Sequence, residues 1–303
     1  MKGLEKVLKY AAICLICLMC LIPFYVLLVL SLNEPSRVFY EGNIFVPTFT
    51  WSIYVLLVLA LNSPQRVFYE GNIFIPDFYW QNFLDAWRKS KIGTAMLNSA
   101  IITAGTLILT IITGGLAGYA IARHNTRYNK FVFGLLLSCM MIPGIINTVP
   151  LYTLMRKIHA VNTLWGMILV CSTLAMPSAV FIYATFIKAL PRELDEAAAL
   201  DGCTGFSAFW RVIFPIIKPA TASFVILNGF GIWNNYAQAT FFLQSRAKQN
   251  IPQALSVFFQ QFGGGKWHLM AATATIAIIP VVIIFLIFQK QFIQGLSDGA
   301  VKG

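Results

Sequence analysis

The sequence predicts an all-α membrane protein, a polytopic bundle of six transmembrane helices with one acidic loop on the cytoplasmic side. Two observations support this fold class. The chain has 303 residues, of which 58% are hydrophobic and only 11% charged, and its mean hydropathy is +0.73. Soluble domains do not have this composition. The apolar residues also gather into runs of about 20 residues or more, which is the length that crosses a hydrocarbon core of about 30 Å.

Six apolar runs predict the spans, and their polar connections predict the topology. The runs cover residues 10–32, 96–122, 131–155, 163–187, 220–243 and 269–288. Proline and glycine interrupt the third run at Pro143, Gly144 and Pro150. Broken helices are tolerated in a membrane where the backbone is buried in protein or lines water. With six spans, both termini and the acidic loop lie in the cytoplasm.

The net charge of +11 indicates membrane anchoring rather than nucleic-acid binding. Lysine and arginine are spread along the chain at the ends of the apolar runs, as the positive-inside rule expects. The six cysteines indicate neither a disulfide framework nor a metal site, because all but Cys203 lie inside apolar runs, where a thiol behaves as a small hydrophobe. The sequence therefore predicts no nucleic-acid partner and no metal.

Residues 1–95 are predicted to form an N-terminal transmembrane helix and an exported segment that contains a tandem duplication. Residues 25–51 repeat as residues 54–80, with 21 of the 27 aligned positions identical. The second copy brings only the end of the first span. Residues 44–61 could compete as a further span, but a seventh crossing would put the N-terminus or the acidic loop on the wrong side. A diverged duplication and a join of two related sequences both explain the repeat.

Two segments beyond the repeat carry packing predictions. Residues 77–91 place aromatic side chains at helical spacing, which favours an amphipathic helix at the outer interface. In the second span, Gly114 and Gly118 have the GxxxG spacing that allows close helix contact in lipid. That contact fits packing within the chain and packing on a second membrane subunit equally well.

The most polar part of the chain is the loop 191–219, which the sequence predicts to be helix, turn, helix. Four of the eleven acidic residues fall within nine positions of it. Acidic side chains favour the first turn of a helix, alanine and leucine continue it, and glycine ends it. The residues with assigned local roles are Pro191 at the first helical position, Gly202 at the helix end, Thr204 as the second cap and Pro215 as a stop or kink.

The loop resembles the EAA loop of permease subunits of binding-protein-dependent ABC importers. The resemblance lies in Glu196-Ala197-Ala198, in Asp201-Gly202 and in Ile213-Phe214-Pro215. In that family the loop is a coupling helix that docks in a groove of a cytoplasmic ATPase subunit. The resemblance therefore implies ATPase-coupling roles for Glu196, Ala197, Ala198, Asp201, Gly202 and Pro215. The alternative is an ordinary cytoplasmic connector of another membrane protein.

The chain's last residues strengthen the resemblance and imply a substrate class. The sequence GLSDGAVKG at residues 295–303 is similar to the terminal signature of the maltose-type, carbohydrate-importing branch. The resemblance makes residues 96–303 a permease core of five transmembrane helices, the loop 191–219 and a cytoplasmic tail. It implies four partners: a cytoplasmic ATPase dimer, a second homologous permease, an extracellular or periplasmic substrate-binding protein, and a sugar. This chain would bind no cofactor, and ATP would be used by the partner subunit.

Polar side chains in the membrane indicate a substrate pathway. The fifth run is the most polar, and amides beside aromatic faces suit a sugar, whose hydroxyls bond to amides and whose ring stacks on aromatics. The candidate pathway residues are Asn147, Asn228, Trp233, Asn234, Asn235 and Tyr236. Because unpartnered polar groups are costly in lipid, hydrogen bonding between helices is an equally good explanation.

The predicted function is a permease, not an enzyme, that carries sugar by alternating access driven by a partner ATPase. The sequence has no Walker motif, no nucleophile–base pair and no metal-ligand spacing. Two alternatives remain open. A permease for an amino acid or osmolyte would share the loop but not the tail. A secondary carrier would need charged residues inside the membrane for ion coupling, and the middles of the six runs contain none.

Overall fold

Helices make up the regular structure of this computed structural model, which describes residues 57, 59–61, 79–260 and 267–300, and no strand occurs among them. The chain divides into two units, residues 1–82 and 83–303. The second unit holds the helix bundle. The first predicted span and almost all of the duplication lie outside the described residues.

The helices follow the order of the predicted apolar runs. They are α5 (Gln81–Ser90), α6 (Ile92–Arg123), α7 (Arg127–Met140), α8 (Thr148–Lys157), α9 (Leu164–Lys188), α10 (Glu193–Leu200), α11 (Gly205–Ala208), the π-helical turn η1 (Phe209–Ile213), α12 (Phe214–Ile216), α13 (Lys218–Trp233), α14 (Ala237–Phe242), α15 (Ile251–Gln260) and α16 (Trp267–Ala300). Helix α5 confirms the helix predicted within residues 77–91.

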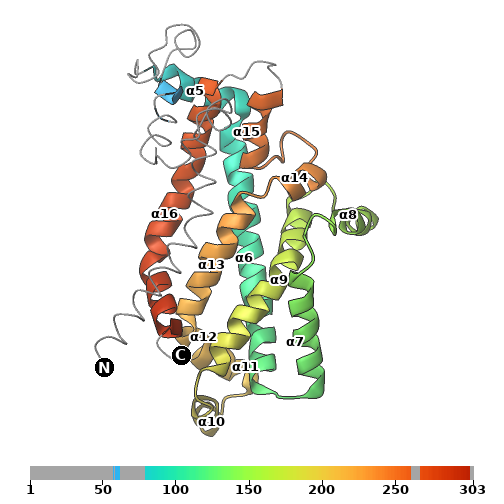
Figure 1. Ribbon diagram of the computed structural model, residues 1–303, viewed down its shortest axis with the longest axis vertical. Helices are drawn as coiled ribbons and strands as arrows, with labels where there is room; N and C mark the ends of the chain where they lie inside the picture. Colours follow the sequence, from blue (N-terminus) through green and yellow to red (C-terminus); the bar gives the residue numbers. More distant parts are fainter. Residues whose placement is uncertain (1–56, 58, 62–78, 261–266, 301–303) are drawn as a thin grey trace, which may run out of the picture. The chain divides into compact units, whose positions relative to one another are not determined.

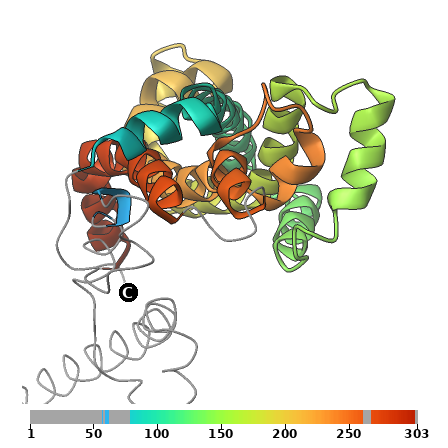
Figure 2. The same cartoon turned by 90° about the horizontal axis from the view of Figure 1, so that it is seen from above.

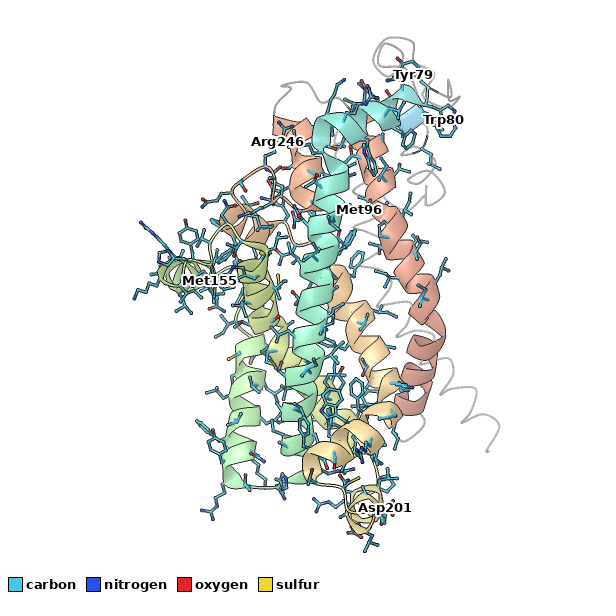
Figure 3. All side chains as sticks on the ribbon, turned by 180° about the vertical axis from the view of Figure 1, so that it is seen from behind. Tyr79, Trp80, Met96, Met155, Asp201 and Arg246 are labelled. Atoms are coloured by element: carbon cyan, nitrogen blue, oxygen red, sulfur yellow. The ribbon has the colours of Figure 1, made fainter. Side chains whose placement is uncertain are left out.

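Five long helices of the second unit lie side by side, in the order α16, α13, α6, α9 and α7 (Figure 1). Seen from above, α16 and α7 lie on opposite sides of the bundle (Figure 2). Helices α10 to α12 lie at one end, which we call the loop end, and α8, α14 and α15 lie toward the other, the far end. In Figure 3, Asp201 marks the loop end and Arg246 the far end.

Among the described residues, two helices are long and apolar enough to cross a membrane without a break, and they confirm the second and fourth predicted spans. These are α6 and α9. The last predicted span is also helical, but α16 continues to Ala300, beyond the predicted end at residue 288. At about 1.5 Å per residue, its 34 residues reach about 50 Å.

The third and fifth predicted spans are broken helices. Helix α7 ends at Met140, and α8 begins at Thr148 after the Pro143–Gly144 segment, as the interruption predicted. The prediction of one apolar span over residues 220–243 is wrong in its second half, because α13 ends at Trp233 and the short α14 follows a turn. The backbone N–H groups of Asn234 and Asn235 close that turn on the carbonyl groups of Phe230 and Ile232.

The close contact between α6 and α9 depends on glycine. A Cβ atom on Gly114 would lie 2.7 Å from the Cβ atom of Ala179, and one on Gly118 would lie 2.7 Å from that of Tyr183. No real side chain tolerates such distances, so the GxxxG face packs within this chain. Of the two explanations left open by the sequence, the structure confirms intrachain packing for these glycines.

A buried cluster of large side chains lies between α6, α9 and the segment after α10, and we call it the loop-end cluster. Its fully buried aromatic members come from α9, η1 and α13. They are Tyr183, Phe209 and Phe224. Because each fully buried aromatic side chain contributes about 1.5–3 kcal/mol, this cluster fixes the base of the acidic loop to the bundle.

Candidate functional site

The acidic helix α10 begins at Glu193, after Arg192 as its N-cap residue. Its first turn contains Glu193, Asp195 and Glu196, which the positive end of the helix dipole favours. The prediction that Pro191 occupies the first helical position is wrong, since Pro191 lies two residues before the helix. The carbonyl groups of Leu190 and Pro191 instead accept hydrogen bonds from Arg123, at 3.1 and 3.3 Å, and this holds the chain in a non-helical turn.

The end of α10 has the geometry that the sequence predicted. Gly202 has φ +78°, a left-handed conformation that favours glycine. The backbone N–H of Cys203 donates to the carbonyl of Ala198, and that of Gly202 donates to Ala199. These two bonds form a Schellman motif, which satisfies carbonyl groups that the helix end would otherwise leave unpaired.

The second half of the loop also folds as predicted, up to a sharp bend. The Thr204 side chain accepts a hydrogen bond from the Ser207 N–H and caps α11. The π-helical turn η1 ends two residues before Pro215, which has no N–H to donate to the carbonyl of Arg211, four residues earlier. The helical segment Gly205–Ile216 then meets α13 at an angle of 75°.

One face of the loop is exposed and carries most of the predicted docking residues. Glu196, Ala197, Asp201, Gly202 and Pro215 are exposed, whereas Ala198 is buried, with 3% of its surface accessible. Ala198 therefore packs on this chain's own bundle in the described structure. The predicted set is divided between a face that a partner can reach and a face that holds the helix in place.

Two apolar side chains on the exposed face were not predicted from the sequence. Leu200 is 90% exposed, and Phe206 is 65% exposed. Leu200 lies in α10 and Phe206 in α11, outside the two described helices that are long and apolar enough to cross a membrane without a break. Exposed apolar side chains rimmed by polar ones mark sites of protein–protein contact. An apolar leucine at the end of an acidic, alanine-rich helix was the available sequence signal.

A buried ion pair attaches α10 to the end of α6. The Nε atom of Arg123 lies 2.7 Å from Oδ2 of Asp195, and the two side chains are only 8% and 21% exposed. The hydroxyl of Tyr119 donates a hydrogen bond to the other carboxylate oxygen of Asp195 at 2.5 Å. We call Tyr119, Arg123 and Asp195 the clamp. Because Arg123 also holds the carbonyl groups before α10, the clamp fixes both the start of the helix and its first turn.

Three of the predicted pathway residues have structural partners. Asn228 accepts a hydrogen bond from the Ser178 hydroxyl at 2.9 Å. Trp233 is 5% exposed and lies in a buried apolar cluster. The Asn235 side chain accepts from the backbone N–H of Gln238. For these positions the geometry supports the structural alternative, and a role in substrate contact stays a prediction.

The remaining pathway residues flank the two breaks in the helices. Asn147 is half-buried before α8, while Asn234 and Tyr236 are exposed beside the end of α13. The structure does not bring the six residues together around one described cavity. Of the six, Asn234 and Tyr236 are the most accessible to a ligand.

A glutamine that was not among the pathway candidates joins the two broken spans. The Gln238 side chain donates to the carbonyl of Gly144 and accepts from the Thr148 hydroxyl. Gln253 similarly donates to the carbonyl groups of Ala239 and Leu243. These amides satisfy backbone groups that broken helices leave open in a membrane. The described residues contain no group of three potential metal ligands.

A family model links these features to a known class of protein. It describes the inner membrane component of binding-protein-dependent transport systems, and it matches residues 110–298, which include α9, the whole loop and α13. The chain belongs to this family. As an inner membrane component, it is a membrane protein that works with a substrate-binding protein.

Relatives of this transport component agree with that assignment over most of their length. The melibiose/raffinose/stachyose import permease MelC of Bacillus subtilis is 43% identical over 73% of this chain and 80% of its own. The arabinooligosaccharides transport system permease AraQ of the same species is 34% identical over 68% and 72%. A crystal structure of a bacterial ABC transporter that imports the acidic polysaccharide alginate matches with a TM-score of 0.72 at 19% identity, covering 86% of this chain and 98% of that one, which shows the same fold.

Proposed function

We propose that this chain is the permease subunit of an ATP-driven importer that moves a sugar or oligosaccharide across the cytoplasmic membrane. The observation that carries the proposal is the loop: a short acidic helix whose inner face is clamped to the bundle and whose outer face exposes Leu200 and Phe206. Both termini and this loop lie in the cytoplasm, and the far end of the bundle faces outward.

The geometry supports coupling by docking. Exposed apolar side chains of the loop enter a groove on the partner ATPase, and the exposed carboxylates of Glu196 and Asp201 meet cations at its rim. When the ATPase dimer closes, α10 moves with it. The clamp passes this movement to α6, and the loop-end cluster passes it to α9 and α13. The bundle then alternates between inward- and outward-facing states.

The sugar substrate follows from the relatives rather than from a described pocket. MelC is named for the import of melibiose, raffinose and stachyose, and AraQ for the transport of arabinooligosaccharides. Both match over more than two thirds of this chain. These relatives favour an oligosaccharide over an amino acid or osmolyte. Under this proposal the chain has no catalytic residue and binds no cofactor, the ATP is hydrolysed by a partner ATPase dimer, and a second homologous permease completes the pore.

The first test is co-purification of an ATPase with this chain from mild detergent. Leu200→Asp adds a charge to a side chain that is 90% exposed, so the fold loses no buried contact. We expect the ATPase to co-purify with the wild-type chain and not with the Leu200→Asp variant. The matched control is Leu154→Asp, at an exposed leucine of α8 toward the far end, which should retain the ATPase. If no ATPase co-purifies with the wild-type chain, the proposal is contradicted.

The substrate is tested separately by uptake of labelled sugars. Vesicles that hold this chain with its partner subunits should accumulate raffinose or an arabinooligosaccharide when ATP is inside and the binding protein is outside. A labelled amino acid at equal concentration should not accumulate. If only the amino acid accumulates, the substrate is not a sugar, but the proposal that the chain belongs to an importer still stands.

A further inference from the structure

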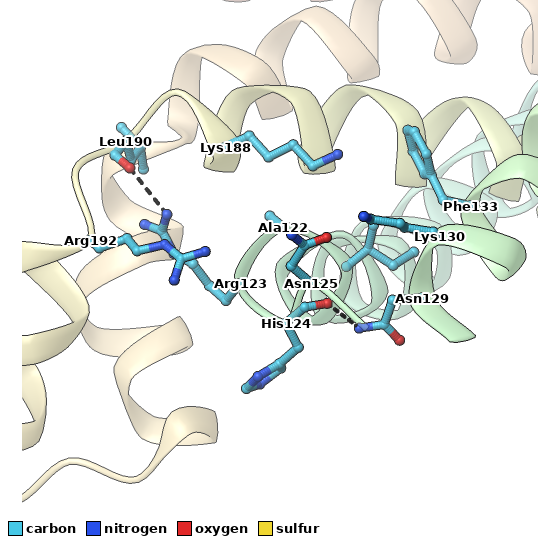
Figure 4. Close-up of a pocket in the computed structure, with 11 residues that line it drawn as sticks. Ala122, Arg123, His124, Asn125, Asn129, Lys130, Phe133, Lys188, Leu190 and Arg192 are labelled. Atoms are coloured by element: carbon cyan, nitrogen blue, oxygen red, sulfur yellow. Dashed lines mark hydrogen bonds between the residues drawn. The ribbon is translucent and has the colours of Figure 1, made fainter. Parts of the chain in front are cut away.

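A cationic pocket lies at the loop end between α6, α7 and α9, beside the clamp but outside the docking face. Its volume is about 320 Å³. Five of its lining residues carry or can carry positive charge, and no residue that lines the pocket is acidic. They are Arg123, His124, Lys130, Lys188 and Arg192. In Figure 4, Arg123 and Arg192 lie near Leu190, while Lys130 and Lys188 lie toward Phe133.

Most of these charges are not neutralised by the chain itself. Arg123 is the exception, since it pairs with Asp195. Among the described residues, no carboxylate forms an ion pair with Lys130, Lys188 or Arg192. The nearby helix α10 is acidic, but its Glu196 and Asp201 are exposed and belong to the docking face. Cations gathered around one pocket repel one another, so an anion that enters the pocket relieves this repulsion.

The pocket opens beside apolar surface suited to lipid chains. The Lys188 ammonium lies 4.8 Å from the centre of the Phe133 ring, which places the charge next to an aromatic face on α7. Helix α7 has no buried residue, and its Phe131 and Leu135 are exposed in the described structure. A ligand with a negative head and apolar chains would contact both surfaces at once.

We propose that this pocket binds the phosphate of an anionic phospholipid, with the acyl chains lying against α7. Basic pockets between transmembrane helices on the cytoplasmic side bind such headgroups because each cation near the anionic leaflet adds attraction. The inference rests on the proposed function in one respect: the pocket faces the cytoplasmic leaflet only if the loop does. A lipid at this place contacts Arg192, directly before α10, and so holds the coupling loop against the membrane surface.

Lipid binding is measured by native mass spectrometry on the full chain, purified with any partners that accompany it and then stripped of lipid. Phosphatidylglycerol, phosphatidylcholine and free glycerol phosphate are added in parallel. We expect phosphatidylglycerol to bind and phosphatidylcholine to bind at least tenfold more weakly. Lys130→Gln plus Lys188→Gln should lower phosphatidylglycerol binding roughly 30-fold, since two cations near an anionic headgroup are removed.

Two control variants make the result specific to the pocket. Arg156→Gln plus Lys157→Gln removes the same charge from exposed positions on α8, toward the far end, and should leave phosphatidylglycerol binding unchanged. Lys130→Arg plus Lys188→Arg keeps the charge and should retain the lipid. The glutamine variant must show the same gel-filtration elution volume and the same melting temperature as the wild type. If the glutamine variant does not fold, the arginine variant still tests the pocket.

Three outcomes would overturn the lipid inference. Equal binding of phosphatidylglycerol and phosphatidylcholine would remove the role of charge. Displacement of the lipid by glycerol phosphate at equal concentration would make a free phosphate the ligand. Loss of the ATPase with the glutamine variant at unchanged lipid content would make the pocket part of the protein–protein interface. Since lipid is counted without sugar or ATP, a negative result here is distinct from failure of ATPase co-purification.

Discussion

The pairing of Asp195 with Arg123 gives an otherwise exposed helix a fixed position. The ion pair is largely buried, and Tyr119 supplies a further hydrogen bond to the same carboxylate. Burying a charge is costly unless its partner is present, so removal of one member of a buried pair typically costs about 3–5 kcal/mol. The clamp therefore holds α10 in a fixed position on α6 only while the charges of Arg123 and Asp195 balance each other.

We predict that Asp195→Asn separates docking from transmission. The Arg123 charge stays buried without its partner, and α10 loses its fixed position on α6. The ATPase should still co-purify, because Leu200 and Phe206 are unchanged, whereas uptake of the sugar should fall at least tenfold. The measurement compares ATPase recovery and uptake on the same preparation.

Two comparisons decide this prediction. Tyr119→Phe removes only a hydrogen bond to a charged carboxylate, worth about 1.5–3 kcal/mol, and leaves the ion pair in place, so it should keep most of the uptake. The double variant Asp195→Asn plus Arg123→Gln removes both charges and should recover part of the stability lost by the single variant. If the Asp195→Asn variant takes up sugar at the wild-type rate, the clamp does not transmit the movement of α10 to α6.

Gly202 carries a separate prediction, because its φ of +78° disfavours most side chains. Nothing lies within 4 Å of the position that a Cβ atom would take, so only backbone strain opposes substitution. Gly202→Val should therefore disturb the turn and reduce ATPase recovery, at a cost of about 1–2 kcal/mol or more. Gly202→Asn should be tolerated, since asparagine adopts the left-handed conformation more readily. Equal ATPase recovery from both variants would argue against a role for the turn geometry.

At the residue scale, the sequence predicts what is local and misses what is distant. The left-handed Gly202 and the Thr204 cap follow from rules that span a few residues, and the structure confirms both. The bond between Tyr119 and Asp195 joins residues 76 positions apart, and no local pattern encodes it. For the same reason, the exclusion of Pro191 from α10 depends on Arg123 and was not foreseen.

At the element scale, the contact of α6 with α9 is the best-defined packing in the described structure. Gly118 faces Tyr183 and the backbone of Ala184, and a Cβ atom would lie 3.0 Å from that backbone nitrogen. The backbone cannot move aside as a flexible side chain can. The two helices therefore depend on glycine for their separation.

We predict that Gly118→Ala lowers the free energy of unfolding by about 1–3 kcal/mol, the usual cost of overpacking. Thermal unfolding of the purified chain in detergent measures the loss. The matched control is Gly134→Ala on α7, where nothing lies within 4 Å of the new methyl group. Because alanine favours helix over glycine by about 1 kcal/mol, the control should be neutral or stabilised. A Gly118→Ala variant as stable as the control would mean that α6 and α9 separate easily.

The breaks in the third and fifth spans show how far periodicity alone can reach. Proline and glycine marked the first break in advance. Nothing comparable marked the end of α13, where the backbone N–H groups of Asn234 and Asn235 close the turn. Beyond that turn, the Gln253 amide donates to the carbonyl groups of Ala239 and Leu243. A polar run in an apolar segment thus indicated broken structure as much as a ligand site, and the sequence could not tell these apart.

At the scale of the whole bundle, the loop and the amide-bonded breaks lie at opposite ends. Under the proposed function, this arrangement would place the ATPase contact on one membrane face and leave the other face for the binding protein. Almost all of the duplicated segment lies outside the described residues, so the exported location predicted for it stays a prediction.

The orientation is testable by cysteine labelling in intact cells and inverted vesicles. In a variant without its native cysteines, Asp201→Cys should react with a membrane-impermeant maleimide only in inverted vesicles. Lys157→Cys, on α8, should react only in intact cells. Both positions are exposed, so lack of reaction reflects the side of the membrane. The opposite pattern would reverse the topology and place the loop outside.

The clamp also limits how such proteins can exchange parts. An acidic loop grafted alone into another permease would arrive without the arginine and tyrosine that fix its first turn. The smallest interchangeable module is therefore discontinuous, comprising the loop and the last turn of α6. Recombination between the two segments would separate α10 from the residues of α6 that hold it. Hybrid importers built for new sugars should therefore take the loop and the end of α6 from the same parent.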